Sequence, residues 1–304
     1  MRAVEHTVAR PVTYRDLGLF TGEPVVMTVH PAAAGSGIVL VRTDLPGSPE
    51  VPAQWGRVAD AERRTMMLGA GNGATIWTVE HLLATFAGLG IDNARVELNG
   101  REVPILDGSA AGLVVPLEEA GVVAQDRLRS WIRVRRPVRV ENGIGTVVME
   151  PAEGFVVHGT IDYPDTAIGR QSYEFALEGS RFRDEIASAR TFCTPADAEK
   201  LRSQGLGLGG NPGNVIQVDG MCVQAKDGLR FADEFIRHKV LDCVGDLYLA
   251  GAPLLGRVTF VRGGHELNRR LLSAIFSEPA NWERSTCPPA SGTWAGTAAR
   301  VAVA

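Results

Sequence analysis

The sequence predicts an α+β protein with two domains of similar design. The chain has 304 residues, and single hydrophobic cores stop growing near ~250–300 residues, so two domains or one large domain are expected. Patterns typical of strands and of helices come in runs rather than in strict alternation, which favours α+β over a doubly wound parallel sheet. Both halves show the order strands, helix, strand, helix. We therefore place domains at 1–126 and 127–284, before a loosely held tail at 285–304 that is rich in Pro, Gly, Ala and Ser.

In the first half, one segment has clear helix boundaries. TVEHLLATFAGLG, residues 78–90, predicts a helix with Thr78 as its N-cap and with Gly88 and Gly90 as its stop. A second helix is expected at about 110–121. Short apolar runs predict the strands of this half at 25–29, 38–42 and 93–98.

The second half begins near Ser130 and again starts with alternating strand patterns. We expect its strands at 131–135, 138–141, 145–149, 155–162 and 257–262. We expect its helices at 182–188, 196–204, 234–250 and 265–276. The helix at 234–250 is the longest one predicted in the chain.

Composition and charge exclude several classes of protein. The chain is 45% hydrophobic and 22% charged with a net charge of −4, and its Lys and Arg residues are scattered, which argues against a nucleic-acid partner. Cysteines 193, 222, 243 and 287 lie far apart without a CxxC pair, so neither a zinc ribbon nor a disulfide framework is expected. The opening MRAVEHTVARPVTYRD lacks the apolar core of a signal peptide, and no apolar run approaches the ~20 residues that span a bilayer. We expect a cytoplasmic protein, with peripheral membrane contact left open.

His238 and Asp242 form the first candidate constellation, within the string RHKVLDCVGD. Positions i and i+4 of a helix lie on the same face, so these side chains can converge on one metal ion, and imidazole with carboxylate suits zinc. Asp246 follows after four more residues, rotated by ~40°, and can reach the rim of the same site. For this pattern alone, a solvent-exposed His–Asp pair is an equally good explanation.

Glu80 and His81 form the second constellation, at the start of the first predicted helix. The histidine offers a third metal ligand, and the adjacent glutamate points about 100° away from it, where it can act as a base. Catalytic zinc keeps three protein ligands and one water, whose pKa falls to about 7. The alternative, which fits this pair alone better, is an acidic residue favoured by the helix dipole beside a half-buried histidine.

The string GGHELN places His265 directly after paired glycines. A histidine in such a turn can act as a general acid or stabilise an oxyanion, and a carboxylate such as Asp246 would favour its charged form. An ordinary histidine in a helix-capping turn explains the string equally well.

The string ARTF offers the Thr191 hydroxyl as a hydrogen-bond donor and the Phe192 ring as a surface for stacking. Taken alone, the string is better explained as the end of a core strand. The later string GLGLGG, which contains Gly210, resembles a phosphate-binding loop only superficially, because it lacks the glycine spacing, the lysine and the following helix.

Read in order, these strings resemble the motifs of the LpxC family, the UDP-3-O-acyl-N-acetylglucosamine deacetylases of lipid A biosynthesis. TVEHLLATFAGLGIDN, VPILDGSA, ARTF, GLGLGG, DGLRFADEFIRHKVLDCVGDL and GGHELN all occur in that order, and the resemblance covers roughly residues 5–280. It implies a fold of two α+β domains, each a sheet layered with helices that pack inward between the sheets, and an active site at the domain interface.

The resemblance also implies the role of each candidate residue. It places one zinc ion, for which Fe²⁺ can substitute, on three ligands, and it assigns hydrolysis of the N-acetyl group of a UDP-linked acylated amino sugar, with release of acetate. We expect a monomer. The implied ligands are His81, His238 and Asp242; the implied catalytic residues are Glu80, His265, Thr191 and Asp246; and the implied substrate-binding residues are Phe192, Lys239 and Gly210.

The chain departs from the family pattern in the segment implied to form the acyl channel. Asn211, Pro212 and Gln217 stand in a stretch that commonly reads GGSxDNAIV, so the resemblance does not fix the acyl-chain length. Two other readings remain: a related zinc amidase acting on a different N-acyl amino sugar, and a non-catalytic homologue. The second predicts lost ligands or a lost base, whereas every ligand and the base are present.

Overall fold

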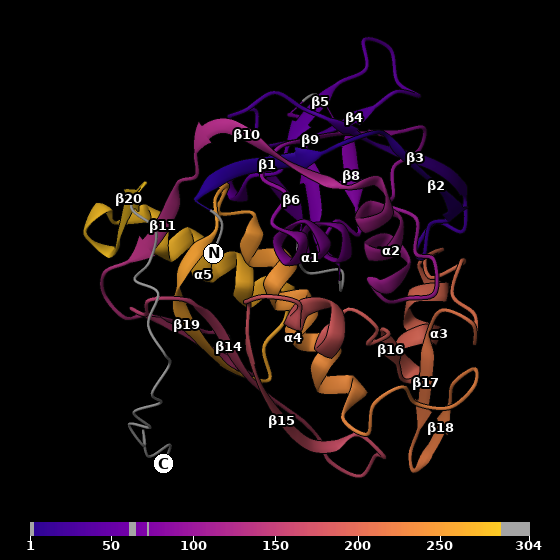
Figure 1. The fold of residues 1–304 in the computed structure, drawn as a ribbon. Coiled ribbons are helices and arrows are strands. Elements are labelled where there is room, and N and C mark those ends of the chain that lie inside the picture. The colour runs from indigo at the N-terminus through magenta and orange to yellow at the C-terminus, as the bar shows by residue number, and fades with distance from the viewer. Residues whose placement is uncertain (1–2, 61–64, 72, 287–304) are drawn as a thin grey trace.

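The structure is a computed structural model that describes residues 3–60, 65–71 and 73–286 (Figure 1). Residues 287–304, which include Cys287 and belong to the predicted tail, lie outside the described residues. The described residues fold into a mixture of sheets and helices, so the predicted α+β class is confirmed.

The first half is built on a five-stranded sheet in the described residues. Along β3, residues Val25, Met27 and Val29 are buried and alternate with more exposed positions, which is the pattern of a sheet with one face on the core. β3 lies antiparallel to β2 and β9, while β4 runs parallel to β9. The strand order is β2 (Val12–Leu17), β3 (Pro24–Pro31), β9 (Ala94–Leu98), β4 (Ile38–Arg42) and β5 (Glu50–Pro52).

The second half is built on a seven-stranded sheet in the described residues, with β19 at its centre. β19 runs parallel to β11 and β14 and antiparallel to β13. Its members are β11 (Trp131–Val134), β12 (Val138–Glu141), β13 (Thr146–Glu150), β14 (Phe155–Tyr163), β15 (Gly169–Ala176), β19 (Leu254–Val261) and β20 (Trp282–Ser285).

Smaller sheets complete the described chain. β1 pairs with β10. Two further sheets have three strands each, β6 with β7 and β8, and β16 with β17 and β18. The sheet of β16, β17 and β18 lies beside α3, on the same side of the molecule (Figure 1). Their bounds are β1 (Val4–Val8), β10 (Val122–Leu128), β6 (Val58–Asp60), β7 (Met67–Gly69), β8 (Thr75–Trp77), β16 (Phe192–Cys193), β17 (Ile216–Asp219) and β18 (Cys222–Gln224).

Helices lie between the two large sheets (Figure 1). α4 packs on β14 and β15, and α5 packs on β12 and β13, so both cover the second sheet. The α-helices are α1 (Glu80–Leu89), α2 (Ala111–Ala120), α3 (Pro195–Ser203), α4 (Glu234–Tyr248) and α5 (His265–Ser277); shorter helical turns lie at Trp55–Arg57, Phe182–Ile186 and Pro279–Asn281.

The closest helix contact joins the two halves, between α1 and α4. A Cβ atom built at Gly245 of α4 would lie 1.9 Å from the carbonyl oxygen of Glu80, so only glycine allows this approach. Nearly every residue of α4 is buried, which is typical of a helix covered on all sides. The approach brings the first turn of α1 against the C-terminal half of α4.

The predicted helix at 78–90 is correct except at its start. Gly90 ends α1 in the left-handed region with φ 68°, as expected for a glycine stop, and Gly88 lies inside the helix. The N-cap is Val79 rather than Thr78, and no side chain caps the helix. Thr78 has φ 60°, and its hydroxyl donates to Glu102 at 2.9 Å rather than accepting from an amide of the helix. The expected N-cap was therefore wrong, because an N-cap residue usually has an extended backbone, whereas Thr78 lies in the left-handed region and the helix begins one residue later.

None of the helices in the described residues is both long and apolar enough to cross a bilayer.

Candidate metal centre and active site

Three buried side chains from two helices form a group that can hold a metal ion. One ligand atom from each of His81, His238 and Asp242 lies within 4.8 Å of the others. Asp242 Oδ1 lies 3.4 Å from His238 Nε2 and 3.6 Å from His81 Nε2. Two residues come from adjacent turns of α4 and the third from the first turn of α1, so the helix contact assembles the group.

The surroundings of His238 leave its Nε2 atom available as a ligand. The ring nitrogen Nδ1 lies 3.0 Å from the carbonyl oxygen of Ala189, so it carries the proton and donates it there. Burial lowers the pKa of His238 to about 4, which keeps the imidazole neutral near pH 7. A neutral imidazole with Nε2 facing the site is the form that binds a divalent metal.

Asp242 is held in its charged form by its neighbours. Burial alone would raise its pKa, but the Lys239 ammonium and the nearby His238 hold it well below the ordinary value. Lys239 Nζ donates to Asp242 Oδ2 at 2.8 Å. The other oxygen, Oδ1, is left to face the two imidazoles.

Glu80 lies beside the metal-ligand group in a buried setting. Burial raises the pKa of its carboxyl, against the opposing effect of His265 and His81. The carboxyl accepts hydrogen bonds from the Thr65 hydroxyl at 2.9 Å and from the Met66 amide at 3.1 Å. A carboxylate with a raised pKa next to a metal site is suited to accept a proton from water.

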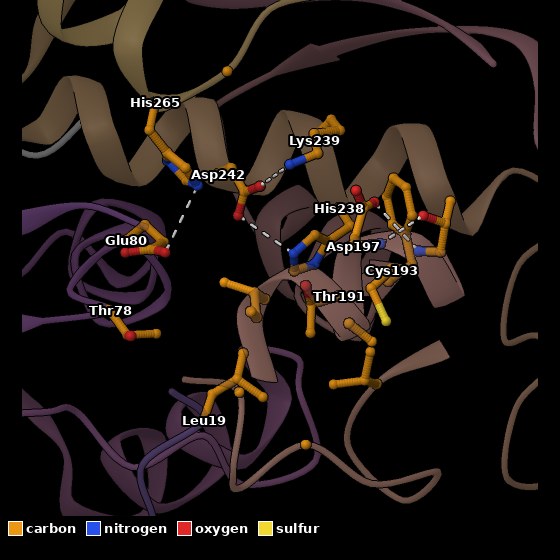
Figure 2. Close-up of a pocket in the computed structure, with 18 of the residues that line it drawn as sticks. Leu19, Thr78, Glu80, Thr191, Cys193, Asp197, His238, Lys239, Asp242 and His265 are labelled. Atoms are coloured by element: carbon orange, nitrogen blue, oxygen red, sulfur yellow. Dashed lines mark hydrogen bonds and ion pairs between the residues drawn. The ribbon is translucent and has the colours of Figure 1, made fainter. Parts of the chain in front are cut away.

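His265 faces Glu80 across the cavity, with Nε2 3.8 Å from Glu80 Oε1 (Figure 2). Its Nδ1 lies 2.8 Å from Asp246 Oδ2, which also accepts from the Asn268 side chain at 2.8 Å. Burial would lower the pKa of His265, but the charge and hydrogen bond of Asp246 raise it to about 9. His265 is therefore protonated near pH 7 and can donate a proton from Nε2.

A cavity of about 660 Å³ opens in front of these groups. Figure 2 shows His238, Lys239 and Asp242 projecting from one helix while Glu80, Thr78 and Leu19 approach from the first half of the chain. The size is within the range of sites that enclose a small-molecule ligand, ~300–1,000 Å³. Each of the sequence-predicted site residues lines the cavity except Asp246, which lies buried behind His265.

The predicted substrate-contacting residues line the second-half wall. The Phe192 ring packs edge-on against Phe235, with centroids 5.1 Å apart, and the Lys239 ammonium lies 5.8 Å from its centroid. Thr191 has its backbone fixed at both ends, because its amide donates to Gly108 and its carbonyl accepts from Ile216. Gly210 lies in a loop on the same wall.

Several residues that build the site carried no signal in the sequence. Thr65 and the Ala189 carbonyl orient Glu80 and His238, and both act through contacts between segments far apart in the chain. Leu19 and Phe20 line the cavity from a loop after β2. A capping motif or helical spacing identifies none of them, because their role depends on tertiary contacts.

The chain is similar to known proteins of one family. The family described as UDP-3-O-acyl N-acetylglycosamine deacetylase, LpxC, matches residues 5–277. The chain is 44% identical over 276 residues to the UDP-3-O-acyl-N-acetylglucosamine deacetylase of Anaeromyxobacter sp. strain Fw109-5, covering 90% of this chain and 89% of that one. It is 40% identical over 279 residues to the enzyme of that name from Myxococcus xanthus strain DK1622, covering 92% and 88%. It is 41% identical over 288 residues to that from Xanthomonas campestris pv. campestris strain B100, covering 93% and 94%.

Proposed function

Since the chain belongs to the LpxC family of UDP-3-O-acyl-N-acetylglucosamine deacetylases, we propose that it hydrolyses the N-acetyl group of a UDP-linked, 3-O-acylated N-acetylglucosamine in lipid A biosynthesis. The products are acetate and a free 2-amino group on the sugar. One observation carries the proposal: three metal-ligand side chains, a buried glutamate and a buried histidine surround a single cavity. Metal-assisted amide hydrolysis uses this combination of Lewis acid, base and acid.

Zinc is the ion we propose for the group of His81, His238 and Asp242. The donor set fits, because two imidazoles and one carboxylate with free lone pairs face one point, and catalytic zinc sites have three protein ligands and one open position. Fe²⁺ accepts the same donors. When bound, the ion acidifies a water molecule and polarises the acetamide carbonyl.

The surrounding residues would move the protons of the reaction. Glu80 accepts the proton of the attacking water, a role that its raised pKa supports. The Thr191 hydroxyl donates to the oxyanion that develops on the acetamide oxygen. Protonated His265, oriented by Asp246, delivers a proton to the leaving amine from Nε2.

The cavity walls would bind the rest of the substrate. Lys239 supplies a cation for the diphosphate and Phe192 an apolar face for the sugar, while Gly210 leaves room in a loop of the same wall. Because the substrate joins a nucleotide to a fatty acyl chain, we propose that the protein makes peripheral contact with the inner membrane. A cytoplasmic location and a monomeric state are separate proposals. We also keep the division into domains at 1–126 and 127–284 as a proposal.

Acetate release tests the proposed substrate. The purified protein is incubated with the UDP-linked acylated sugar and, separately, with simple N-acetyl amino sugars. Release from the first substrate alone is the expected result. Release only from the simple sugars would instead support a related zinc amidase with a different substrate.

Two variants separate the ligand and base roles. The wild type should bind about one zinc ion per chain, and His238→Ala should lose it. Glu80→Ala should keep the metal while turnover falls by roughly 10²–10⁴-fold, the range that a general base contributes. Full zinc content in His238→Ala would disprove the ligand assignment, and unchanged turnover in Glu80→Ala would disprove the base.

A further inference from the structure

Thr78 has an unusual backbone conformation at the edge of the cavity. It is buried, with 2% of its surface exposed, and its φ of 60° lies in the left-handed region. A β-branched residue rarely adopts that conformation, so the surrounding structure must hold it there. Thr78 lies two residues before Glu80 and three before His81, which means that its backbone sets the direction in which α1 starts.

The side chain that holds Thr78 is Glu102. This carboxyl group is 2% exposed, and its Oε1 accepts from the Thr78 hydroxyl at 2.9 Å and from the Phe20 amide at 2.8 Å. Its Oε2 accepts from the amide and the hydroxyl of Thr21, both at 2.9 Å. Both oxygens are therefore fully used, and the carboxyl group connects the segment before α1 to the loop after β2.

That loop forms part of the cavity wall and contacts the second half of the chain. A Cβ atom at Gly18 would lie 2.3 Å from Glu102 Oε2, so the loop closes around the carboxyl group. The carbonyl oxygen of Leu19 accepts from the Gly209 amide at 3.0 Å. Glu102 thus connects two parts of the cavity: the start of α1 and the wall that carries Leu19 and Phe20.

A second hydroxyl links the same network to the proposed base. Thr65 Oγ1 lies 2.9 Å from Glu80 Oε1 and 3.2 Å from Thr78 Oγ1. The Thr65 hydroxyl can donate its single proton to Glu80 or to Thr78 Oγ1, which still accepts while its own proton is donated to Glu102. The position of Thr78 therefore affects both the backbone of Glu80 and the hydroxyl that contacts its carboxylate.

We infer that Glu102 is a positioning residue: its hydrogen bond to Thr78 holds the left-handed turn that directs Glu80 and His81 into the cavity. Glu102 itself is not among the residues that line the cavity, so it acts only through Thr78 and the loop after β2. The inference rests on the proposed function for its kinetic consequences. Its geometric consequence, the placement of His81 in the metal site, can be measured without turnover.

The test compares two substitutions at Thr78. Thr78→Ala removes the hydroxyl, and Thr78→Ser keeps it. We expect Thr78→Ala to weaken equilibrium zinc affinity, measured by competition with a chelator, by roughly 10-fold, the lower end of what loss of a ligand-orienting partner costs. Its kcat should fall by a similar factor with little change in KM, because the base is displaced while the substrate-binding wall remains. Thr78→Ser should match the wild type within about twofold in both measurements.

Glu102→Gln supplies the second arm, and it carries the test if Thr78→Ala does not fold. It should weaken zinc affinity and lower kcat as Thr78→Ala does. The double variant should lose no more zinc affinity than the worse single variant, because both changes break the same hydrogen bond between Thr78 and Glu102. Thr21→Ala is the matched control: it removes a hydroxyl from the other oxygen of the same carboxyl group and should leave zinc affinity unchanged.

Two outcomes would overturn the inference. One is unchanged zinc affinity in both Thr78→Ala and Glu102→Gln, and the other is an equal loss in Thr78→Ser and Thr78→Ala. A wild type that binds zinc without deacetylating the UDP-linked sugar would refute the proposed function alone, since the zinc affinities would still decide the role of Glu102.

Discussion

His265 and Asp246 show how two residues can set a proton donor at the residue scale. The imidazole is buried, which disfavours its charged form, yet the carboxylate at 2.8 Å outweighs the burial. The same hydrogen bond fixes Nδ1 as a donor to Asp246 and leaves Nε2 to face Glu80. Orientation and protonation therefore come from a single contact.

The pH dependence of His265 follows from this contact. Because its pKa in the folded protein, about 9, is raised above the ordinary ~6.5, the ring is protonated near neutral pH and loses its proton as the pH rises through about 9. Its contribution to stability is likewise complete below pH ~6.5 and is lost as the pH rises through its folded-state pKa. Imidazole NMR of the metal-free protein measures the titration, since a bound dication would lower the pKa. Asp246→Asn should bring the pKa to ~6.5 or below.

The resonance that disappears in His265→Gln identifies the ring, and circular dichroism shows whether Asp246→Asn is folded. A wild-type His265 that titrates near ~6.5 would show that Asp246 does not stabilise the charged form.

The three metal-ligand residues show which part of the site could be predicted from the sequence. The spacing of His238 and Asp242 predicted that both face one point, because residues four apart on a helix share a face. The same spacing alone fitted an exposed pair equally well. Their burial, and the approach of His81 from 157 positions earlier in the chain (238 − 81), depend on tertiary packing that no local pattern encodes.

At the scale of elements, the contact between α1 and α4 determines the geometry of the site. His238 and Asp242 project from α4, whereas Glu80 and His81 belong to the first turn of α1. The helices can lie this close only because Gly245 has no side chain at the point of contact. A change of helix spacing would separate the ligands, since they are divided between the two helices.

Gly245→Ala tests the importance of this contact. Alanine favours a helix interior over glycine by ~1 kcal/mol, so propensity alone predicts a more stable protein. The new Cβ atom would instead lie 1.9 Å from the Glu80 carbonyl, and such overpacking costs typically ~1–3 kcal/mol. We expect a lower free energy of unfolding in urea, together with weaker zinc binding.

Gly56→Ala is the matched control. A Cβ atom at Gly56 would meet no atom of the described residues within 4 Å, and the backbone there has no left-handed φ. The substitution should therefore change stability by less than ~0.5 kcal/mol. If Gly245→Ala were as stable as Gly56→Ala, the close approach would not limit the packing of these helices.

Helices were easier to predict than small strands. α4 and α5 match the predicted ranges at 234–250 and 265–276 within two residues at each end, because their stop and start signals are local. The short strand β18 was not predicted, since three residues carry no periodicity, and the string ARTF indicated only a strand end where β16 lies. β16 nevertheless carries Phe192 and helps form the cavity wall.

At the scale of the whole molecule, one hydrophobic core extends through both halves. Leu82 and Phe86 of α1, Val240 and Leu247 of α4 and residues from both large sheets belong to a single buried cluster. The metal ligands are not members of this cluster, although their neighbours on the same helices are, so the hydrophobic core does not depend on the metal site. The protein should therefore fold without its metal, unlike a zinc finger, whose folding depends on the ion.

Removal of the metal tests this view of the molecule. Chelation should abolish acetate release but leave the far-ultraviolet circular dichroism unchanged, because the core supplies most of the stability. Zinc at ~100 times its Kd should restore activity and add ~2.7 kcal/mol, which corresponds to a rise in Tm of roughly 5 °C. Asp242→Ala should show no such rise, whereas His158→Ala, which changes a partly exposed histidine paired with Glu174 on the second sheet, should respond like the wild type. A chelated protein that unfolds at room temperature would mean that the metal, and not the shared core, holds the halves together.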